Sequence, residues 1–377
     1  MSSRSSKSAA IGSLASHISE LSSELSDHLR NSGHPDLTFT ADSPTVPDTA
    51  EYEALRGLLN DAAMDLLHLL NGSKSTLRSF FLSHYDLAAL QVALARGFFN
   101  HVPLPDLGRI SESRDAANEL RGASVEEIAE KGGISFDRTA RVLKMLATHR
   151  IFEKVPGHSN RFQHTAASAL MARDQSFQAT ADMQMDDMLR AASATIAAVE
   201  RSPGLSTQET SPFTTAYEIS MYEYYEQRPI KAARFAQAMS GWSQLDRQIL
   251  ELCETYPWNS FKNGKVMDVG GGSGHISIEL ARLFKSLRFV VQDISPFMLS
   301  QSQDEAIRDL NGRVTFQQHS YFDIQPVTDA DAFFLRQCLH NNNDADCIKI
   351  IQALVPALGK CKRHTPLLIN DVIMPEY

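Results

Sequence analysis

The stretch Val266–Phe284 reads VMDVGGGSGHISIELARLF and places four glycines within five residues. An apolar run, Val266–Val269, precedes the glycines, and an apolar pattern typical of a helix, Ile276–Phe284, follows them. Glycines at such a turn let backbone N–H groups approach a ligand closely, because no Cβ intervenes. The pattern D-x-G-G-G-x-G lacks the Lys-Ser/Thr pair of a P-loop, which argues against nucleotide hydrolysis. The stretch therefore predicts a strand, a turn and a helix, and the turn is either a tight connection or a ligand cradle.

The segments after the glycines alternate between strand-like and helix-like patterns. Arg288–Gln292, Arg313–Ser320, Asp331–Leu339 and Pro366–Pro375 all have the composition of strands. Alternation of this kind is typical of a parallel α/β sheet. We therefore expect an α/β fold with a Rossmann-like domain from residue 263 onward.

Polar residues stand at the ends of these predicted strands. Asp293 follows the second strand about twenty residues after the glycines, where an acid can accept hydrogen bonds from both ribose hydroxyls of a dinucleotide or of S-adenosylmethionine. Ligands of open α/β sheets bind beyond the carboxyl ends of the strands. The residues expected on that edge are Asp268, Asp293, His340 and Asp371. A lone histidine at a strand end is usually a surface residue, but an acid on the next strand beside it favours a functional site.

The first 262 residues have mainly helical patterns. We expect an N-terminal helix and flexible loop over 1–75, a helical and winged-helix region over 76–180, and a helical linker that supplies part of a substrate pocket over 181–262. Ser124 and Glu127 have the spacing of a capping box. The Met and Tyr side chains between Met221 and Tyr225 are expected chiefly in the core, the more frequent place for such residues.

A winged helix suggests DNA binding, and the charge of the chain argues against it. The 377 residues carry 36 Lys and Arg against 45 Asp and Glu, a formal net charge of −9. Glu126, Glu127 and Glu130 lie next to the few basic residues of the motif. Since phosphate contacts dominate DNA affinity, we predict no nucleic-acid partner. No apolar run is long enough to cross a bilayer, and four cysteines without metal-ligand spacing predict reduced thiols and no metal site. A cytoplasmic protein is expected.

Three motifs in order, VMDVGGGSGHISIELARLF, VVQDIS and FFLRQCLHNNNDADC, follow the winged-helix pattern. Together they resemble the plant- and fungal-type small-molecule O-methyltransferases that use S-adenosyl-L-methionine, and the fungal secondary-metabolism members most of all. The resemblance covers roughly residues 80–377. It implies a winged-helix dimerisation region, a homodimer, and a hydroxylated aromatic or polyketide-like substrate.

The resemblance also implies roles for individual residues. His340 stands where the family has its general base, and Asp371 where an acid orients that histidine. Gly270 and Gly272 would lie against the methionine part of the cofactor, Asp293 would bind the ribose, and Arg336 would contact the cofactor or support the pocket. The residues that the motifs place at the cofactor are Asp268, Gly270, Gly272, Asp293, Ser320, Tyr321 and Arg336.

The chain departs from the family pattern at three places. Asn342 replaces a tryptophan two residues after the histidine, and Ser320 replaces an acid that helps hold adenine. The chain ends at MPEY, where the family pattern continues with another helix and a strand pair, so we expect a shortened domain with an exposed apolar edge at its fifth strand. Intact cofactor motifs beside a weakened catalytic turn leave an alternative open. This alternative is a non-methylating cyclase that binds S-adenosylmethionine, or an inactive homologue.

Overall fold

The computed structural model describes residues 11–105, 122–205, 207–243, 245, 248–301, 308 and 310–373. The chain forms two compact units, Met1–Gln175 and Ser176–Glu376. The described part contains no helix that is both long enough and apolar enough to cross a membrane.

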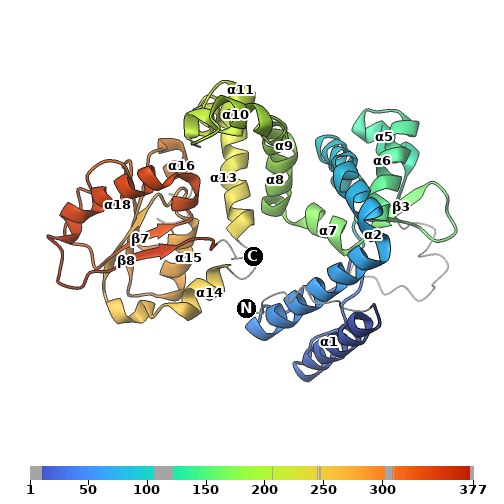
Figure 1. Ribbon diagram of the computed structural model, residues 1–377, viewed down its shortest axis with the longest axis horizontal. Coiled ribbons are helices and arrows are strands. Elements are labelled where there is room, and N and C mark those ends of the chain that lie inside the picture. The colour runs from blue at the N-terminus through green and yellow to red at the C-terminus, as the bar shows by residue number, and fades with distance from the viewer. Residues whose placement is uncertain are drawn as a thin grey trace. The chain divides into compact units, whose positions relative to one another are not determined.

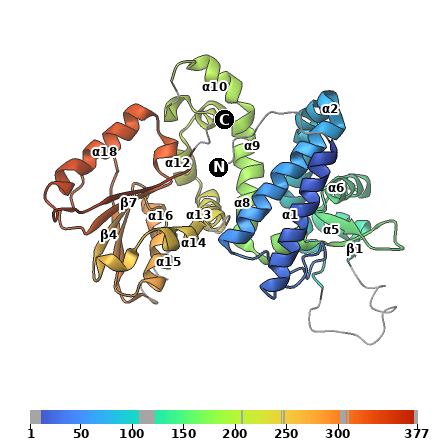
Figure 2. The same cartoon turned by 60° about the horizontal axis from the view of Figure 1, so that its bottom comes forward.

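Helices dominate the first unit. Its elements are α1 (Ile11–Asn31), α2 (Ala50–Ala95), α3 (Phe98–His101), β1 (Ala123–Ser124), α5 (Val125–Gly132), α6 (Phe136–Thr148), β2 (Phe152–Lys154), β3 (Arg161–His164) and α7 (Ala166–Arg173). The helix α1 lies along α2, as Figure 2 shows. Leu21 of α1 is buried. Thr49 caps α2, and Gly72 interrupts its helical dihedral angles at φ 65°. Residue 75, which we take from the sequence as a region boundary, therefore lies inside α2.

A small antiparallel sheet completes the first unit. Its strand order is β1-β3-β2, and α5 and α6 precede the β2–β3 hairpin. Ser124 and Glu127 form the expected capping box: the Glu127 N–H donates to the Ser124 hydroxyl at 3.1 Å, and the Ser124 N–H donates to the Glu127 carboxylate at 2.6 Å. The capping prediction is confirmed.

The second unit begins with short helices. They are α8 (Gln175–Met183), the π-helix η1 (Gln184–Met188), α9 (Leu189–Ser193), α10 (Thr195–Arg201), η2 (Gln208–Thr210), α11 (Pro212–Tyr217), α12 (Met221–Glu226), α13 (Pro229–Ser243), α14 (Gln248–Thr255) and η3 (Trp258–Phe261). Serines cap two of them: the Ser211 hydroxyl accepts the N–H of Thr214 in α11, and the Ser220 hydroxyl accepts the N–H of Glu223 in α12.

A parallel sheet forms the rest of this unit. Its elements are β4 (Lys265–Val269), α15 (His275–Leu283), β5 (Arg288–Asp293), α16 (Pro296–Ser300), β6 (Val314–Gln318), β7 (Ala332–Arg336), η4 (Leu339–Asn341), α18 (Asp344–Leu358) and β8 (Leu367–Asn370). The strand order is β6-β5-β4-β7-β8, and every pairing is parallel. The Rossmann-like α/β prediction is confirmed.

Helices cover both faces of the sheet, as Figure 1 shows. On one face α14, α15 and α16 pack on a core that contains Trp258, Phe289 and Phe334. On the other face α18 packs on Met267 and Phe333. The chain runs from β4 outward through β5 and β6, and then returns to β7 on the other side of β4. The topological switch point, where such sheets bind ligands, therefore lies at the carboxyl ends of β4 and β7.

Candidate active site

The glycine loop joins β4 to α15 at this switch point. The N–H groups of Gly270 and Gly271 donate to the Gln292 carbonyl at 2.8 and 2.9 Å. Gly270 has φ 76°, a left-handed conformation that side chains avoid. A Cβ added there would lie 2.8 Å from the Cys338 sulfur and 3.2 Å from the Tyr321 ring. The loop is therefore closely packed and leaves its surface free of side chains.

Asp268 lies under this loop. The residue is 3 % exposed, and its carboxylate accepts a hydrogen bond from the Ser277 hydroxyl at 2.6 Å. A Cβ on Gly271 would lie 2.5 Å from the carboxylate oxygen Oδ2. Burial raises the pKa of Asp268 to about 6, although Ser277 and Arg336 oppose the shift. Asp268 thus supports the loop from below.

Asp293 ends β5, as expected, and its carboxylate faces the glycine loop. The N–H of Gly272 donates to Oδ2 at 3.1 Å, and the N–H of Ser295 donates to Oδ1 at 2.9 Å. Burial raises the pKa of Asp293, and the backbone hydrogen bonds oppose this shift. Backbone donors on both sides fix the carboxylate in one orientation, which suits a residue that must bind a pair of hydroxyl groups.

A cavity of about 130 Å³ lies above the loop. Its walls include four residues predicted at the cofactor, Gly270, Asp293, Ser320 and Tyr321. The remaining lining residues are Gln208, Tyr222, Ile294, Phe322, Gln337, Cys338 and Asn341. Three other predicted residues, Asp268, Gly272 and Arg336, are not among them. Asp268 supports the loop from β4, and Gly272 lies in the loop and donates its N–H to Asp293. Burial lowers the pKa of Arg336, and Asp268 opposes that change.

The predicted catalytic pair is joined by a hydrogen bond. The Nδ1 atom of His340 lies 2.5 Å from Oδ1 of Asp371. Asp371 also accepts the N–H groups of Leu339 at 3.1 Å, His340 at 3.2 Å and Val372 at 2.9 Å. Burial alone would raise the pKa of Asp371, but the hydrogen bonds from His340 and the backbone outweigh it and lower that pKa. The acid is therefore ionised at neutral pH and oriented toward the imidazole.

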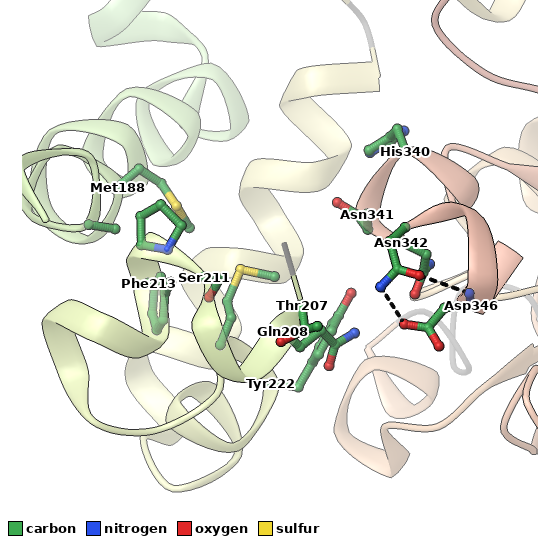
Figure 3. A pocket seen from close by; sticks show the side chains of 14 residues that line it. Met188, Thr207, Gln208, Ser211, Phe213, Tyr222, His340, Asn341, Asn342 and Asp346 are labelled. Atoms are coloured by element: carbon green, nitrogen blue, oxygen red, sulfur yellow. Dashed lines mark hydrogen bonds between the residues drawn. The ribbon is translucent and has the colours of Figure 1, made fainter. Parts of the chain in front are cut away.

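A second cavity, of about 450 Å³, has His340 in its wall. Figure 3 shows Met188 and Phe213 on one side of it and His340 and the asparagines that follow on the other. Its lining residues are Met188, Ala191, Thr207, Gln208, Ser211, Pro212, Phe213, Met221, Tyr222, His340, Asn341, Asn342, Asn343 and Asp346. Gln208, Tyr222 and Asn341 line both cavities. The two cavities are thus neighbours.

The expectation that Met221–Tyr225 lies chiefly in the core is correct for only part of this segment. Tyr224 and Tyr225 are buried at 5 % and 4 % exposure, but Met221 and Tyr222 line the second cavity. Burial raises the pKa of the Tyr222 hydroxyl, and the nearby Tyr321 and Asp293 raise it further. The phenol is therefore neutral at physiological pH. Apart from Glu223, the residues of the segment are all Met or Tyr, so composition alone cannot separate the wall of the cavity from the core.

Asn342 stands where the family pattern has tryptophan. Its side-chain amide donates to the Cys338 carbonyl at 2.9 Å and so closes the turn after β7. Sequence reasoning did not identify Tyr222, Gln208 or Asn341 as site residues. The sequence offered a clue for Asn341 alone, because that residue directly follows His340 at the predicted ligand edge of the sheet.

Comparison with known proteins identifies the reaction. The family model of the O-methyltransferase domain matches residues 201–376. The O-methyltransferase sol2 of Alternaria solani is 44 % identical over 368 residues, which are 97 % of this chain and 81 % of that protein. The chain belongs to this O-methyltransferase family. It is an S-adenosylmethionine-dependent O-methyltransferase similar to fungal enzymes of secondary metabolism.

One further relative and one solved structure are also similar to this chain. A chlorophenol O-methyltransferase of Trichoderma longibrachiatum is 28 % identical over 96 % of this chain and 76 % of that protein. The crystal structure of OxaC superimposes with a TM-score of 0.71 at 17 % identity, over 97 % of this chain and 86 % of that one, which shows a shared fold.

The residues present fit the cofactor of this family. A glycine loop without side chains, the fixed Asp293 carboxylate and the cavity between them suit a nucleoside with a vicinal diol. In the part of the chain that the structure describes, no group of three or more His, Cys, Asp or Glu is placed to hold a metal ion.

Proposed function

We propose that this O-methyltransferase methylates a phenolic hydroxyl group of a small secondary metabolite, with His340 as general base and Asp371 as the residue that positions it. The observation that carries the proposal is the 2.5 Å contact of His340 Nδ1 with Asp371, in the wall of a cavity that adjoins the cofactor cavity. The O-methyltransferase that is 44 % identical to this chain supports methyl transfer over a non-methylating reaction.

Asp371 determines which nitrogen of His340 can act as the base. Its carboxylate is ionised and acts only as an acceptor, so Nδ1 carries the proton of the neutral imidazole. The other ring nitrogen, Nε2, is then left as a proton acceptor. A phenol with a pKa of about 10 loses its proton to this nitrogen as its oxygen attacks, and the nearby Asp371 carboxylate stabilises the resulting imidazolium.

The cofactor supplies an electrophilic methyl group on its sulfonium. We assign Asp293 to the ribose, Gly270 and Gly272 to the methionine part, and Ser320 with Tyr321 to the adenine side. Asp268 supports the loop, and Arg336 supports the same end of the sheet. The enzyme then mainly has to hold the acceptor oxygen in line with the methyl carbon.

The acceptor cavity favours an amphipathic aromatic molecule. Met188, Phe213 and Met221 give one side an apolar surface, and His340 and Asn341 give the other side hydrogen-bonding groups. Its volume of about 450 Å³ is in the range of small-molecule sites. The chlorophenol O-methyltransferase among the relatives supports a phenolic acceptor.

We further infer a cytoplasmic homodimer, in which α5, α6 and the β2–β3 hairpin form a winged helix that serves dimerisation. The support for the dimer is the apolar surface of α2. Its exposed residues include Leu58, Met64, Leu67, Leu69, Leu70, Leu77, Phe80, Phe81 and Tyr85. Exposed apolar side chains in this number on one helix suit contact with a second copy of the chain better than contact with water.

The experiment that tests the base compares two phenols. Pentachlorophenol is ionised at neutral pH and needs no base, whereas a naphthol is protonated. H340Q should lower kcat for the naphthol by roughly 10²- to 10⁴-fold and leave kcat for pentachlorophenol much less affected. Equal losses on both phenols would show that His340 only binds or shapes the site. Cofactor binding without methyl transfer to any phenol of a wider panel would refute the phenolic acceptor.

A further inference from the structure

A buried carboxylate lies beside the acceptor cavity and has no part in the chemistry described above. Asp187 lies in the π-helix η1 and is 0 % exposed. Short π-helical segments occur frequently at functional sites. An ionised side chain in such a place needs several partners, because burial of an unpaired charge is very unfavourable.

Four donors meet the Asp187 carboxylate. Tyr224 donates to Oδ1 at 3.2 Å and Tyr225 to Oδ2 at 3.1 Å. Lys231 donates to Oδ1 and Arg234 to Oδ2, both at 2.6 Å. The Tyr217 hydroxyl donates to the backbone carbonyl of Asp187 at 3.2 Å. A single residue therefore joins η1 to α11, α12 and α13.

Residues next to this cluster in the sequence line the acceptor cavity. Met188 follows Asp187 directly, and Met221 and Tyr222 precede Tyr224 in α12. Tyr222 also lines the cofactor cavity. The parts of the cavity wall that η1 and α12 supply are thus joined through the same carboxylate.

The adjacent Asp186 contacts the same two cations, so two acids together balance the charges of Lys231 and Arg234. Its carboxylate also accepts hydrogen bonds from Lys231 at 2.9 Å and Arg234 at 2.8 Å, but its side chain is 49 % exposed. Asp186 alone already gives both cations a partner at the surface. A second, fully buried acid adds little stability, because desolvation offsets the attraction, but it fixes the geometry of its donors.

We propose that Asp187 is a positioning residue for methyl transfer, which holds Met188 and Tyr222 at the spacing that aligns the acceptor with the cofactor. The inference deepens the proposed function and rests on it only for the choice of acceptor. The hydrogen bonds from Tyr224 and Tyr225 fix α12 relative to the carboxylate, and those from Lys231 and Arg234 fix α13.

The test uses the full chain in three variants. D187N removes the charge at constant shape, Y225F removes one donor with the carboxylate in place, and D186N is the matched control at the exposed neighbour. Hydrogen exchange of a peptide that spans 218–228 is followed with and without S-adenosylhomocysteine, and methylation of pentachlorophenol is followed by initial rates.

We expect D187N to speed exchange in α12 by about tenfold and Y225F to speed it less. We expect kcat/KM for the acceptor to fall by roughly 10- to 100-fold in D187N, because a small misplacement is costly for methyl transfer, while the Kd of S-adenosylhomocysteine stays near its wild-type value. D186N should resemble the wild type in both measurements.

Two results would overturn the inference. Exchange in α12 that is the same in D187N as in the wild type would show that Asp187 does not hold this helix. Faster exchange with an unchanged kcat/KM would show a structural role only. If the wild type methylates no phenol, the proposed acceptor fails, and the exchange measurement still decides whether Asp187 positions α12. A D187N chain that does not fold, seen as lost S-adenosylhomocysteine binding, leaves Y225F to decide both points.

Discussion

The G270A substitution tests how the glycine loop shapes the cofactor site. Gly270 has φ 76°, so an alanine there is strained by about 1–2 kcal/mol whatever surrounds it. Its Cβ would in addition lie 2.8 Å from the Cys338 sulfur, a contact that is too close. Cys338 is 5 % exposed, so its sulfur has little room to move away. Overpacking of this kind costs about 1–3 kcal/mol, and the sum is about 2–5 kcal/mol.

Two other glycines serve as controls that separate the backbone strain of G270A from its close contact with Cys338. Gly312 has φ 73° with no atom within 4 Å of a Cβ, so G312A carries the conformational strain alone. Gly272 has φ 58° and only an ordinary contact, at 3.6 Å, with Met298. G272A should therefore lose about as much stability as G312A, although it lies in the loop.

Denaturant unfolding and calorimetry with S-adenosylmethionine check these expectations. G270A should lose clearly more stability than G312A, and it should weaken cofactor binding by at least about fivefold if half of its cost falls on the bound state. G312A should bind the cofactor as the wild type does. The reasoning is refuted if G270A and G312A are equally stable, or if G270A binds the cofactor normally.

Three further predictions concern other parts of the chain. D371N should lower kcat for a naphthol by about 10²- to 10⁴-fold with little change in cofactor Kd, since the imidazole loses its orienting acceptor; an unchanged kcat would contradict the assigned pair. Burial raises the pKa of Asp268 to about 6, above the roughly 3.9 of the unfolded chain. Between these two pH values the folded, cofactor-free protein keeps a proton that the unfolded chain has lost. Its free energy of unfolding should therefore fall by up to about 3 kcal/mol as pH rises from about 4 to 6. D268N should flatten this decline in pH-dependent unfolding, and a slope equal to that of the wild type would refute the assignment. F80E, at a residue 79 % exposed on α2, should produce monomers in sedimentation velocity, whereas L283E, at a residue 56 % exposed on α15 and outside both α2 and the winged helix, should not.

Most of the fold could be predicted from sequence patterns that are local. The glycine cluster between Val266–Val269 and Ile276–Phe284 is a strand, turn and helix in the structure because only glycine adopts that turn easily. Strand ends could be located in the same way, so the prediction that Asp293 and His340 lie on the ligand edge of the sheet followed from topology alone. The sequence and the topology were sufficient for these residues because parallel strands share one carboxyl edge.

The acceptor side of the site could not be predicted in the same way. Met221 and Tyr222 line the cavity while Tyr224 and Tyr225 are buried, and the choice depends on how α12 packs on Asp187. Such packing joins residues up to 38 positions apart and leaves no local pattern. The expectation of a shortened C-terminal domain stays a prediction.

The most direct test of the account is product analysis with S-adenosylmethionine that carries a deuterated methyl group. We predict that the wild-type enzyme transfers one labelled methyl group to a phenolic oxygen, seen by mass spectrometry, and that H340Q forms this product from a naphthol roughly 10²- to 10⁴-fold more slowly. A phenolic product without the label, or a labelled product formed equally fast by H340Q, would contradict the account.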